Sequence, residues 1–360
     1  MTTVEYRPDK SDAWNRVHAE RMAAAGQGAA EARHETHELA VPDETAVTYA
    51  PAPAVAVPEE KIAGDVVLRA IRVCLGYFAV WPSEEALNAA TLYVAASHAR
   101  EMQDGWLLPV WQYAPRFFIT SSQHGSGKSQ MARMMGYLVP DGTTLVEPTK
   151  ASLISLIAKA RTVVVTEADV LFGTKRNQGI LAIANASYEP DRRHSHKFGG
   201  KDVEVPTFQF MILDGLDTMI TSTGVELRTL LSRCITVHAR RGPRGYRPPR
   251  FDDAAREQFK AVRELCAQWI AQEIRAGLRQ YVPELPDGVG NRAAALWEPP
   301  CAVAQKAGHD WPELAATACA RLEDATGTDA QEAVEQTRQS STLAAWARAQ
   351  GREWEGEDLS

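Results

Sequence analysis

The strongest chemical signal in the sequence is a glycine-rich run, SQHGSGKS, over residues 122–129. Glycines at 125 and 127 let main-chain N–H groups curl around phosphate oxygens, and a helix that follows adds its positive N-terminal end. In such loops Lys128 reaches the outer phosphates and the Ser129 hydroxyl ligates Mg²⁺. We therefore predict a site for ATP and Mg²⁺ whose contact residues are Ser122, Gln123, His124, Gly125, Ser126, Gly127, Lys128, Ser129 and Gln130.

The flanks of this run are those that a phosphate-binding loop requires. An apolar strand, RFFIT, is expected over residues 116–120, and a helix is expected over 129–137. Ser122 stands where the motif usually begins with glycine, although the Gly-x-Gly-Lys-Ser portion is intact. The alternative is a glycine turn followed by Lys-Ser by chance.

A second chemical signal is the run TVVVTEAD over residues 162–169, a β-branched strand that ends in acidic residues. Glu167 is the candidate base that orients an attacking water, with Lys128 as the other catalytic residue. Thr166 occupies the place where an aspartate normally assists Mg²⁺. Its hydroxyl can hydrogen-bond a metal-bound water but carries no charge, so hydrolysis is expected to be weak. The predicted metal residues are Ser129, Thr166 and Glu167, whereas Asp169 is expected to be structural.

These residues must be positioned by strands that alternate with helices. Five apolar runs separated by helical segments predict an α/β P-loop fold with a five-stranded, mostly parallel sheet covered on both faces. The fourth strand is followed by Asp214, which is either a polar sensor near the γ-phosphate or part of the local structure. The expected strands cover residues 116–120, 144–147, 162–166, 208–213 and 234–238.

The remaining chain divides by composition. The chain is predicted to begin with an acidic extension and a Pro/Ala linker over residues 1–60. The ATPase core follows over residues 61–250 and is preceded by helices at 62–80 and 83–102. A helical C-terminal lid region is expected over residues 251–322, and an acidic polar tail over 323–360. His34 and His37 have metal-like spacing, but a solvated segment is the alternative. The acidic ends are candidate sites for protein partners.

Composition excludes several classes of protein. No apolar run approaches the length of about 18 residues that a membrane helix needs, and the N-terminus is too polar for a signal peptide. Five cysteines lie at scattered positions, which is typical of reduced thiols in a cytoplasmic protein. The formal net charge of −7 resides in the two ends, because residues 61–320 hold 30 Lys and Arg against 26 Asp and Glu. An acidic chain of this kind can still bind nucleic acid through local basic patches.

Three blocks carry a resemblance to a known family: residues 119–129, residues 167–173, and NRAAALWEP over residues 291–299 followed by Trp311-Pro312. Residues 65–322 resemble a P-loop ATPase domain of unknown function carried by actinobacterial phages, plasmids and integrative elements. They are more broadly similar to AAA+ and superfamily III helicase ATPases, which work as rings. The resemblance implies a homo-oligomeric, DNA-stimulated ATPase or helicase-like motor in phage or mobile-element replication. Thr166 departs from the family pattern, and no primase domain is present in the sequence.

The resemblance also implies roles for three arginines. Arg228 and Arg233 flank the end of the helix before the last strand, where ring ATPases place an arginine that reaches the neighbouring subunit's nucleotide. Arg233 is the preferred candidate, with a surface salt bridge as the alternative. Arg292 resembles the lid arginine that contacts the γ-phosphate, with helix capping beside Asp287 as the alternative.

Two basic segments are candidate DNA contacts. In the run DRRHSHKFGGK over residues 191–201, Gly199-Gly200 predicts a hairpin turn, and related helicases carry a DNA-binding pore hairpin at this point. Its cations would neutralise phosphates of single-stranded or forked DNA while an aromatic ring stacks on a base. An exposed basic loop is the alternative. A second run, RRGPRGYRPPR over residues 240–250, is first a charged linker. The predicted DNA residues are Arg192, Arg193, Lys197, Phe198 and Lys201.

Two functions from different classes therefore stay open. The first is a DNA-stimulated ATPase motor. The second is an ATP-gated switch or assembly factor that hydrolyses weakly because of Thr166 and recruits replication or regulatory proteins through its acidic ends. A small-molecule kinase is a third possibility, disfavoured because no substrate-lid pattern follows the loop. Stimulation of hydrolysis by DNA separates the motor from the switch.

Overall fold

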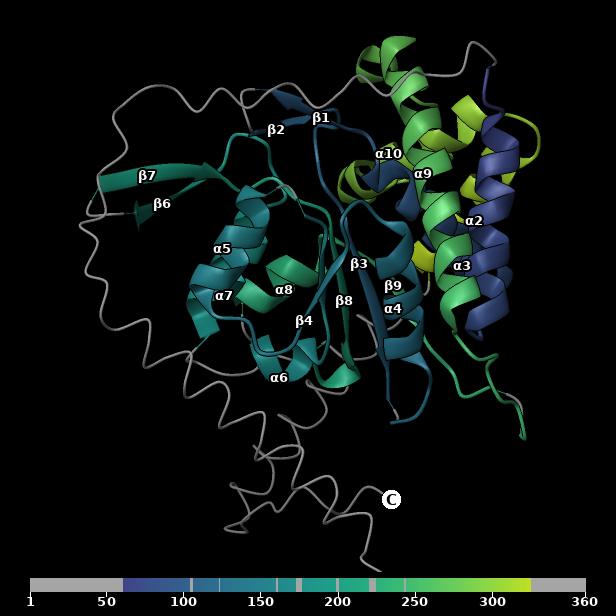
Figure 1. The fold of residues 1–360 in the computed structure, drawn as a ribbon, viewed down its shortest axis with the longest axis horizontal. Coiled ribbons are helices and arrows are strands. Elements are labelled where there is room, and N and C mark those ends of the chain that lie inside the picture. The colour runs from purple at the N-terminus through teal and green to yellow at the C-terminus, as the bar shows by residue number, and fades with distance from the viewer. Residues whose placement is uncertain are drawn as a thin grey trace, which may run out of the picture. The chain divides into compact units, whose positions relative to one another are not determined.

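A five-stranded, fully parallel sheet lies at the centre of the structure, with strand order β4-β5-β8-β3-β9 (Figure 1). The chain is thus α/β, as predicted. Each predicted strand is present, although β8 begins three residues later than expected because its neighbours β3 and β5 offer ladder partners only from that level. The strands are β3 (Arg116–Ser121), β4 (Thr143–Leu145), β5 (Val163–Val165), β8 (Met211–Leu216) and β9 (Cys234–His238).

The computed structural model describes residues 61–324 apart from 104–105, 123, 160, 173–176, 199–200, 220–224 and 243. The expected extension over 1–60, the His34 and His37 pair, and all but the first two residues of the expected tail lie outside the described residues. No helix among the described residues is long and apolar enough to cross a bilayer.

The central strands are continuous apolar runs because helices cover both faces of the sheet. All residues of β3 and β5 are buried. On one face lie α5 (Lys150–Ala158), α6 (Ala168–Phe172), α7 (Gln178–Ala186) and α8 (Val225–Leu231). On the other face α4 (Lys128–Leu138) lies directly on the sheet, and four longer helices pack outside it: α2 (Gly64–Phe78), α3 (Glu84–Ser97), α9 (Asp253–Arg275) and α10 (Asn291–Ala307).

Helix α4 approaches the sheet closely because small residues line the contact. A Cβ at Gly142 would lie 1.9 Å from the main-chain oxygen of Gly136, and a Cβ at Gly136 would lie 3.1 Å from Val164. Only glycine fits at position 142 without moving the helix. The start of α4, and any group that it positions, is therefore set by its packing against β5.

The C-terminal helices share one hydrophobic core with the N-terminal helices. Trp269 on α9, Trp297 on α10 and Trp311 beyond it are fully buried in the cluster that also contains α2 and α3. The indole Nε1 of Trp311 donates to Asp65 Oδ1 on α2 at 3.0 Å. Residues 251–322 are helical as predicted, and they pack as a layer with α2 and α3.

One feature differs from the predicted organisation, and one predicted feature is present outside the central sheet. The second N-terminal helix ends at Ser97 rather than at residue 102, because residues 100–103 form β1 (Arg100–Gln103), paired antiparallel with β2 (Trp106–Pro109). The predicted basic hairpin is present as β6 (Arg193–Phe198) and β7 (Lys201–Pro206), antiparallel and separate from the central sheet. Figure 1 shows it extending outward beyond α5. The described residues also include two short 3₁₀ turns, η2 (Asp217–Met219) and η3 (Leu278–Gln280), and a last helix over residues 311–324.

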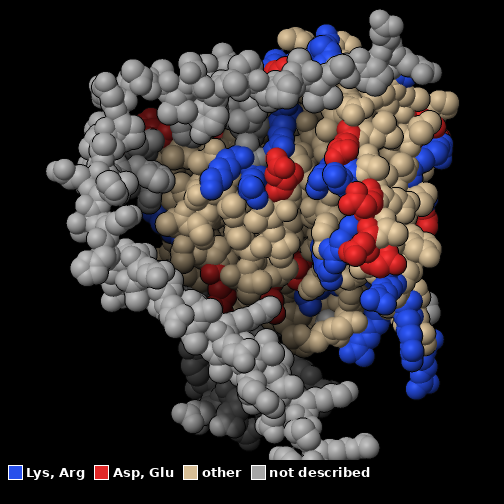
Figure 2. All heavy atoms as spheres, viewed as in Figure 1, with Lys and Arg blue, Asp and Glu red and all other residues tan. Residues whose placement is uncertain are grey.

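Charged side chains are unevenly distributed on the face seen in Figure 2. Over the helical layer, Asp and Glu lie beside Lys and Arg, whereas Lys and Arg alone gather at the lower right. The five cysteines are all buried and free, and burial raises the pKa of Cys74 to about 11. Buried thiols of this kind are inert, and all five are free, as the prediction of reduced thiols requires.

Candidate functional site

The glycine loop, residues 122–129, connects the end of β3 to the start of α4. Gly125 and Gly127 have φ angles of 75° and 85°, which L side chains rarely adopt, and a Cβ at either position would meet no atom within 4 Å. Glycine is therefore required here by backbone conformation rather than by crowding. Gly127 caps α4, so Lys128 and Ser129 are its first two residues. The free N–H groups of the first turn of α4 point out at this end of the sheet.

Ser129 is joined to the neighbouring strand by its side chain. Its Oγ donates to Asp214 Oδ1 at 3.0 Å. Asp214 is fully buried on β8 at the level of Ile119 on β3. Burial raises the pKa of the Asp214 carboxyl, while hydrogen bonds from Ser129 and from the main-chain N–H of Glu167 act in the opposite direction. The other carboxyl oxygen, Oδ2, is buried and has no hydrogen-bond partner among the residues that the structure describes.

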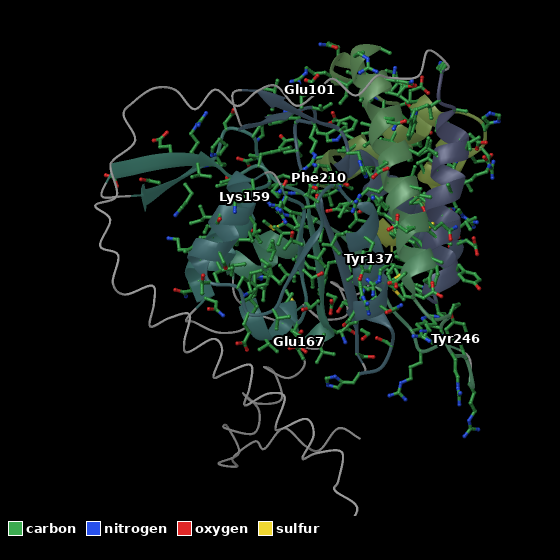
Figure 3. All side chains as sticks on the ribbon, in the orientation of Figure 1. Glu101, Tyr137, Lys159, Glu167, Phe210 and Tyr246 are labelled. Atoms are coloured by element: carbon green, nitrogen blue, oxygen red, sulfur yellow. The ribbon has the colours of Figure 1, made fainter. Side chains whose placement is uncertain are left out.

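Thr166 and Glu167 follow β5 at the same edge of the sheet. Val165 pairs with Leu213, so Thr166 is level with Asp214 on the adjacent strand. The Thr166 hydroxyl donates to the main-chain oxygen of Leu145 at 3.3 Å, on the side away from β8. Glu167 is exposed and has a left-handed φ of 54°, a conformation that costs a non-glycine residue about 1 kcal/mol. Figure 3 places it at the edge where the strands end.

Asp169 has a structural contact. A Cβ at Gly215 would lie 2.9 Å from Asp169 Oδ1, so the absence of a side chain on β8 lets the start of α6 pack against the strand. This placement agrees with the structural role expected for Asp169.

A pocket of about 350 Å³ opens beside Ser129, between α4 and the strands β4 and β5. Two of the three predicted metal residues, Ser129 and Thr166, therefore line one hollow. Among the described residues, no group of three His, Cys, Asp or Glu side chains could hold a metal ion. Mg²⁺ bound with a nucleotide needs no such group, because phosphate oxygens and water supply most of its ligands. The pocket is lined by Ser129, Arg133, Gly136, Tyr137, Gly142, Thr144, Val164 and Thr166.

Other residues of the glycine loop have distinct environments. Ser126 is buried and its Oγ donates to Ser121 Oγ at 2.8 Å, whereas Ser122 and His124 are exposed. The Gln130 amide donates to the main-chain oxygen of Phe78 at 3.3 Å, so it joins α4 to α2. Gln123 lies outside the described residues.

Four residues at this edge were not predicted. The Arg241 Nη2 donates to the main-chain oxygen of His124 at 3.0 Å. Thr120 Oγ1 donates to Asp217 Oδ1 at 2.6 Å, and His238 Nδ1 lies 3.9 Å from the same oxygen. The sequence holds no motif for these contacts, because they join segments that are far apart along the chain. They attach the glycine loop and β3 to the segments that follow β8 and β9.

The predicted arginines lie at the other edge of the sheet or are already engaged. The Arg233 side chain is only 15% exposed, and its Nη1 donates to the main-chain oxygen of Asn185 at 2.6 Å. Its guanidinium lies 4.8 Å from the Tyr188 ring centroid and 3.5 Å from Glu189. Arg228, in the last turn of α8, is exposed.

Arg292 corrects one expectation. Its charge acts on the pKa of both Tyr188 and Arg233, which indicates that Arg292 lies near these two groups. The main-chain N–H of Ala114, just before β3, donates to the main-chain oxygen of Tyr188. The cluster of Tyr188, Arg233 and Arg292 is therefore at the start of the strands. A six-residue strand spans about 20 Å, and the glycine loop is at its other end. The structure therefore does not bring Arg292 to the glycine loop of its own chain.

The β6–β7 hairpin carries acidic as well as basic residues. Lys197 is in register with Asp202, and Ser195 is in register with Glu204, so each pair shares a face of the hairpin. Arg192, just before β6, forms an ion pair with Glu189 at 2.8 Å. The side chains of Lys197, Phe198 and Lys201 lie outside the described part of the structure. The hairpin geometry is confirmed, and its role as a DNA contact stays a prediction.

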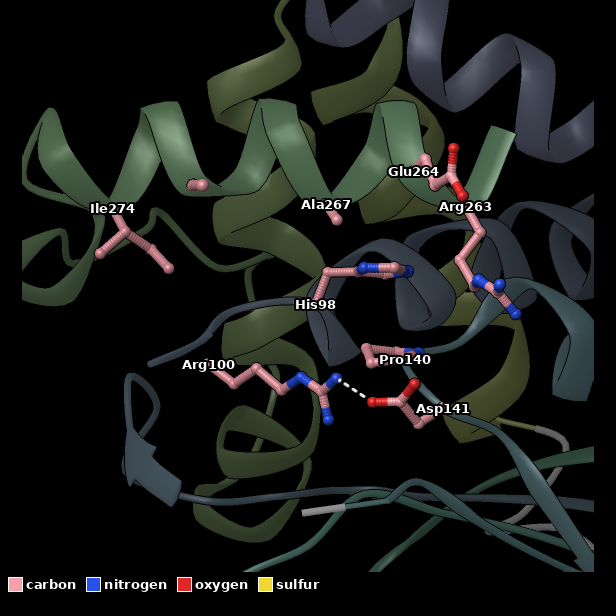
Figure 4. Close-up of a pocket in the computed structure, with 9 residues that line it drawn as sticks. His98, Arg100, Pro140, Asp141, Arg263, Glu264, Ala267 and Ile274 are labelled. Carbon is pink, nitrogen blue, oxygen red and sulfur yellow. Dashed lines mark hydrogen bonds and ion pairs between the residues drawn. The ribbon is translucent and has the colours of Figure 1, made fainter. Parts of the chain in front are cut away.

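A second cavity, of about 260 Å³, lies at the far end of α4 (Figure 4). His98 is buried between α9 and Pro140, and its Nε2 donates to the main-chain oxygen of Leu138 at 2.8 Å. Arg100 and Asp141 form an ion pair at 2.8 Å on the opposite wall. This cavity is separated from the glycine loop by the length of α4, so it is not part of the same site.

Comparison with known proteins gives one match. Residues 238–349 match a family model described as a protein of unknown function (DUF3631). The match begins at the last residue of β9 and covers α9 and α10, including the block at residues 291–299, but not the glycine loop. A comparison with curated proteins found no match.

Proposed function

We propose that this chain binds ATP with Mg²⁺ at the glycine loop and hydrolyses it in a DNA-stimulated reaction, as a helicase-like motor in phage or mobile-element replication. One observation carries the nucleotide site. Two glycines with left-handed φ lead into the positive end of α4, whose second residue, Ser129, is hydrogen-bonded to the buried Asp214. The replication context rests on the resemblance of residues 65–322 to the mobile-element ATPase domain.

The loop has the chemistry to hold a triphosphate. Main-chain N–H groups around Gly125 and Gly127 and the N-terminus of α4 are aimed at one place, where phosphate oxygens would accept from them. Lys128, the first residue of α4, would add a positive charge there. Because these groups are set by the backbone, they need little rearrangement when charge develops on the phosphates.

The residues around Ser129 also fit a magnesium ion. When bound there, Mg²⁺ would neutralise phosphate charge. The Ser129 hydroxyl would be a ligand, and Asp214 has a buried oxygen with no partner. Asp214 is level with Thr166 on the adjacent strand. We therefore propose that Asp214 supplies from β8 the carboxylate that Thr166 lacks on β5.

Glu167 is the proposed base. It is exposed, it directly follows Thr166, and its main-chain N–H bonds the Asp214 carboxyl. The left-handed φ of Glu167 turns the chain sharply between β5 and α6. A carboxylate held at this turn can accept a proton from a water molecule that attacks the outer phosphate.

A ring would bring a neighbour's arginine to this site. Arg228 is exposed, whereas Arg233 is held by Asn185, Tyr188 and Glu189 of its own chain. Exposure thus favours Arg228 as the residue that reaches a neighbouring subunit, in contrast to the preference for Arg233 drawn from the sequence.

A second function is favoured by one specific observation. The Thr166 hydroxyl donates its hydrogen bond to the main-chain oxygen of Leu145, and it carries no charge. If Asp214 does not replace the missing carboxylate, ATP would be bound and hydrolysed poorly. The chain would then act as an ATP-gated switch whose acidic ends recruit replication or regulatory proteins.

Steady-state ATP hydrolysis with and without single-stranded DNA tests the proposal, with Lys128→Ala and Glu167→Gln as variants. We expect DNA to raise turnover in the wild type and both variants to lose it. Lys128→Ala should also weaken nucleotide binding, whereas Glu167→Gln should retain it. Nucleotide binding without turnover in any condition would favour the switch. Unchanged turnover in Lys128→Ala would contradict the glycine loop as the nucleotide site.

A further inference from the structure

The segment that leaves β9 is the most strongly charged part of the described chain. Residues 240–242 and 244–250, here called the arginine segment, hold five arginines and no Asp or Glu. It connects β9 to α9 at the edge of the sheet that carries the glycine loop. The predominantly basic area at the lower right of Figure 2 lies over it.

Within the described residues, no acidic side chain neutralises most of the arginine segment. Arg240, Arg244, Arg247 and Arg250 are exposed, and the described part of the structure gives none of them an ion pair or side-chain hydrogen bond. Other arginines are paired: for example, Arg69 binds Asp65 and Asp310, and Arg192 binds Glu189. In the β6–β7 hairpin, which the sequence predicts as a DNA contact, Lys197 is in register with Asp202, and Arg192 just before it is paired with Glu189.

The segment is nevertheless held in place at both ends. At its start, Arg241 donates to the main-chain oxygen of His124 in the glycine loop. At its end, the Phe251 ring packs 4.6 Å from the Tyr137 centroid on α4 and 5.3 Å from that of Phe78 on α2. A charged segment anchored in this way loses less conformational entropy on binding than a free linker does.

An exposed aromatic ring lies among these arginines. Tyr246 is 41% exposed, and its ring packs over Gly242, where a Cβ would lie 3.3 Å from Cδ1. Figure 3 shows Tyr246 on the part of the segment that projects beyond the helical layer. Spaced guanidinium groups bind phosphate oxygens in forked pairs, and exposed aromatic rings stack on unpaired bases.

We infer that the arginine segment is a binding surface for the backbone of single-stranded DNA. This inference deepens the proposed DNA-stimulated ATPase and rests on it for the role of the bound DNA. Because Arg241 contacts the glycine loop, DNA bound here would lie next to the nucleotide site. The partner is nucleic acid rather than a membrane, because the segment offers arginine, glycine, proline and one tyrosine but no aliphatic side chain to insert.

The test uses the full chain with Arg244, Arg247 and Arg250 changed to Gln, leaving Arg241 in place. Anisotropy of a fluorescein-labelled oligothymidylate measures the affinity across a range of salt concentrations. We expect a loss of about tenfold or more, and a salt slope smaller by about 2, since each single-strand phosphate contact contributes about 0.7. A matched variant changes three exposed lysines to Gln: Lys150, Lys159 and Lys260.

The lysine variant should keep most of the wild-type affinity. An unchanged slope in the arginine variant, an equal loss in the two variants, or no DNA binding by the wild type would overturn the inference. Binding of a fluorescent ATP analogue is measured in the same samples without DNA. Retained nucleotide binding shows that the arginine variant is folded. If the wild type binds DNA through this segment but binds no nucleotide, the proposed function fails while the DNA surface stands.

Discussion

The Ser129 hydroxyl donates to the Asp214 carboxylate at 3.0 Å, although the two residues are 85 positions apart in the chain. The first residue lies in the glycine loop, and the second is buried within the neighbouring strand β8. Because β8 lies between β3 and β5, a carboxylate stands beside the loop even though Thr166 at the end of β5 has none.

The proposed role of Asp214 predicts that Asp214→Asn strongly weakens Mg²⁺-dependent nucleotide binding, by about tenfold or more, since a charge-assisted contact is worth about 1.5–3 kcal/mol. Adding Thr166→Asp to that variant should restore part of the affinity, because it supplies a carboxylate at the same level of the sheet. The measurement is ATP affinity with Mg²⁺ and with EDTA. Equal affinity of Asp214→Asn and wild type with Mg²⁺ would contradict this role.

The two candidate arginines should behave differently. Arg233→Ala is expected to lower the free energy of unfolding by about 2 kcal/mol, because it removes a main-chain hydrogen bond and a cation–π contact. Arg228→Ala should leave stability unchanged and abolish turnover. Mixing Arg228→Ala with Glu167→Gln subunits should restore some turnover, since an intact site would then face an intact arginine. Full turnover by Arg228→Ala alone would remove it as the neighbour's arginine.

The β6–β7 hairpin is expected to contribute to DNA binding less than the arginine segment. Changing Arg192, Arg193 and Lys197 to Gln should weaken binding only a few fold, because Asp202 is in register with Lys197 and Glu189 is paired with Arg192. Anisotropy at several salt concentrations makes the comparison. A larger loss here than in the arginine-segment variant would make the hairpin the main contact.

His98 predicts a dependence of stability on pH. Burial lowers the pKa of His98 to about 4, and the nearby Arg100 and Arg263 act in the same direction, while the bond to Leu138 and the charge of Asp141 oppose them. The unfolded chain, with an ordinary pKa of 6.5, therefore binds more protons between pH 6.5 and 4. The contribution of His98 to the free energy of unfolding is therefore fully present above that range. It is lost as the pH decreases through the range, by about 3 kcal/mol in all. Urea unfolding across this range should show the decrease, and His98→Gln should show less of it. Parallel pH profiles for the two proteins would contradict this assignment.

The sequence by itself determined the local features of this protein. Gly125 and Gly127 permit the left-handed backbone of the loop, and the helix that follows them has Lys128 and Ser129 at its start. The apolar runs form strands buried on both faces, since such runs are stable only between two helical layers. The hairpin at residues 193–206 follows from its glycine turn in the same way.

Only the tertiary structure decided which distant side chains meet. Strand order placed Asp214 beside Ser129 and level with Thr166, which no local pattern indicates. Packing of the C-terminal helices placed Arg292 at the start of the strands, away from the glycine loop. The tertiary structure also brought the Arg241 side chain to the main-chain oxygen of His124. Spacing along a chain predicts which residues share a helix or strand, but contacts across a sheet depend on how those elements pack together.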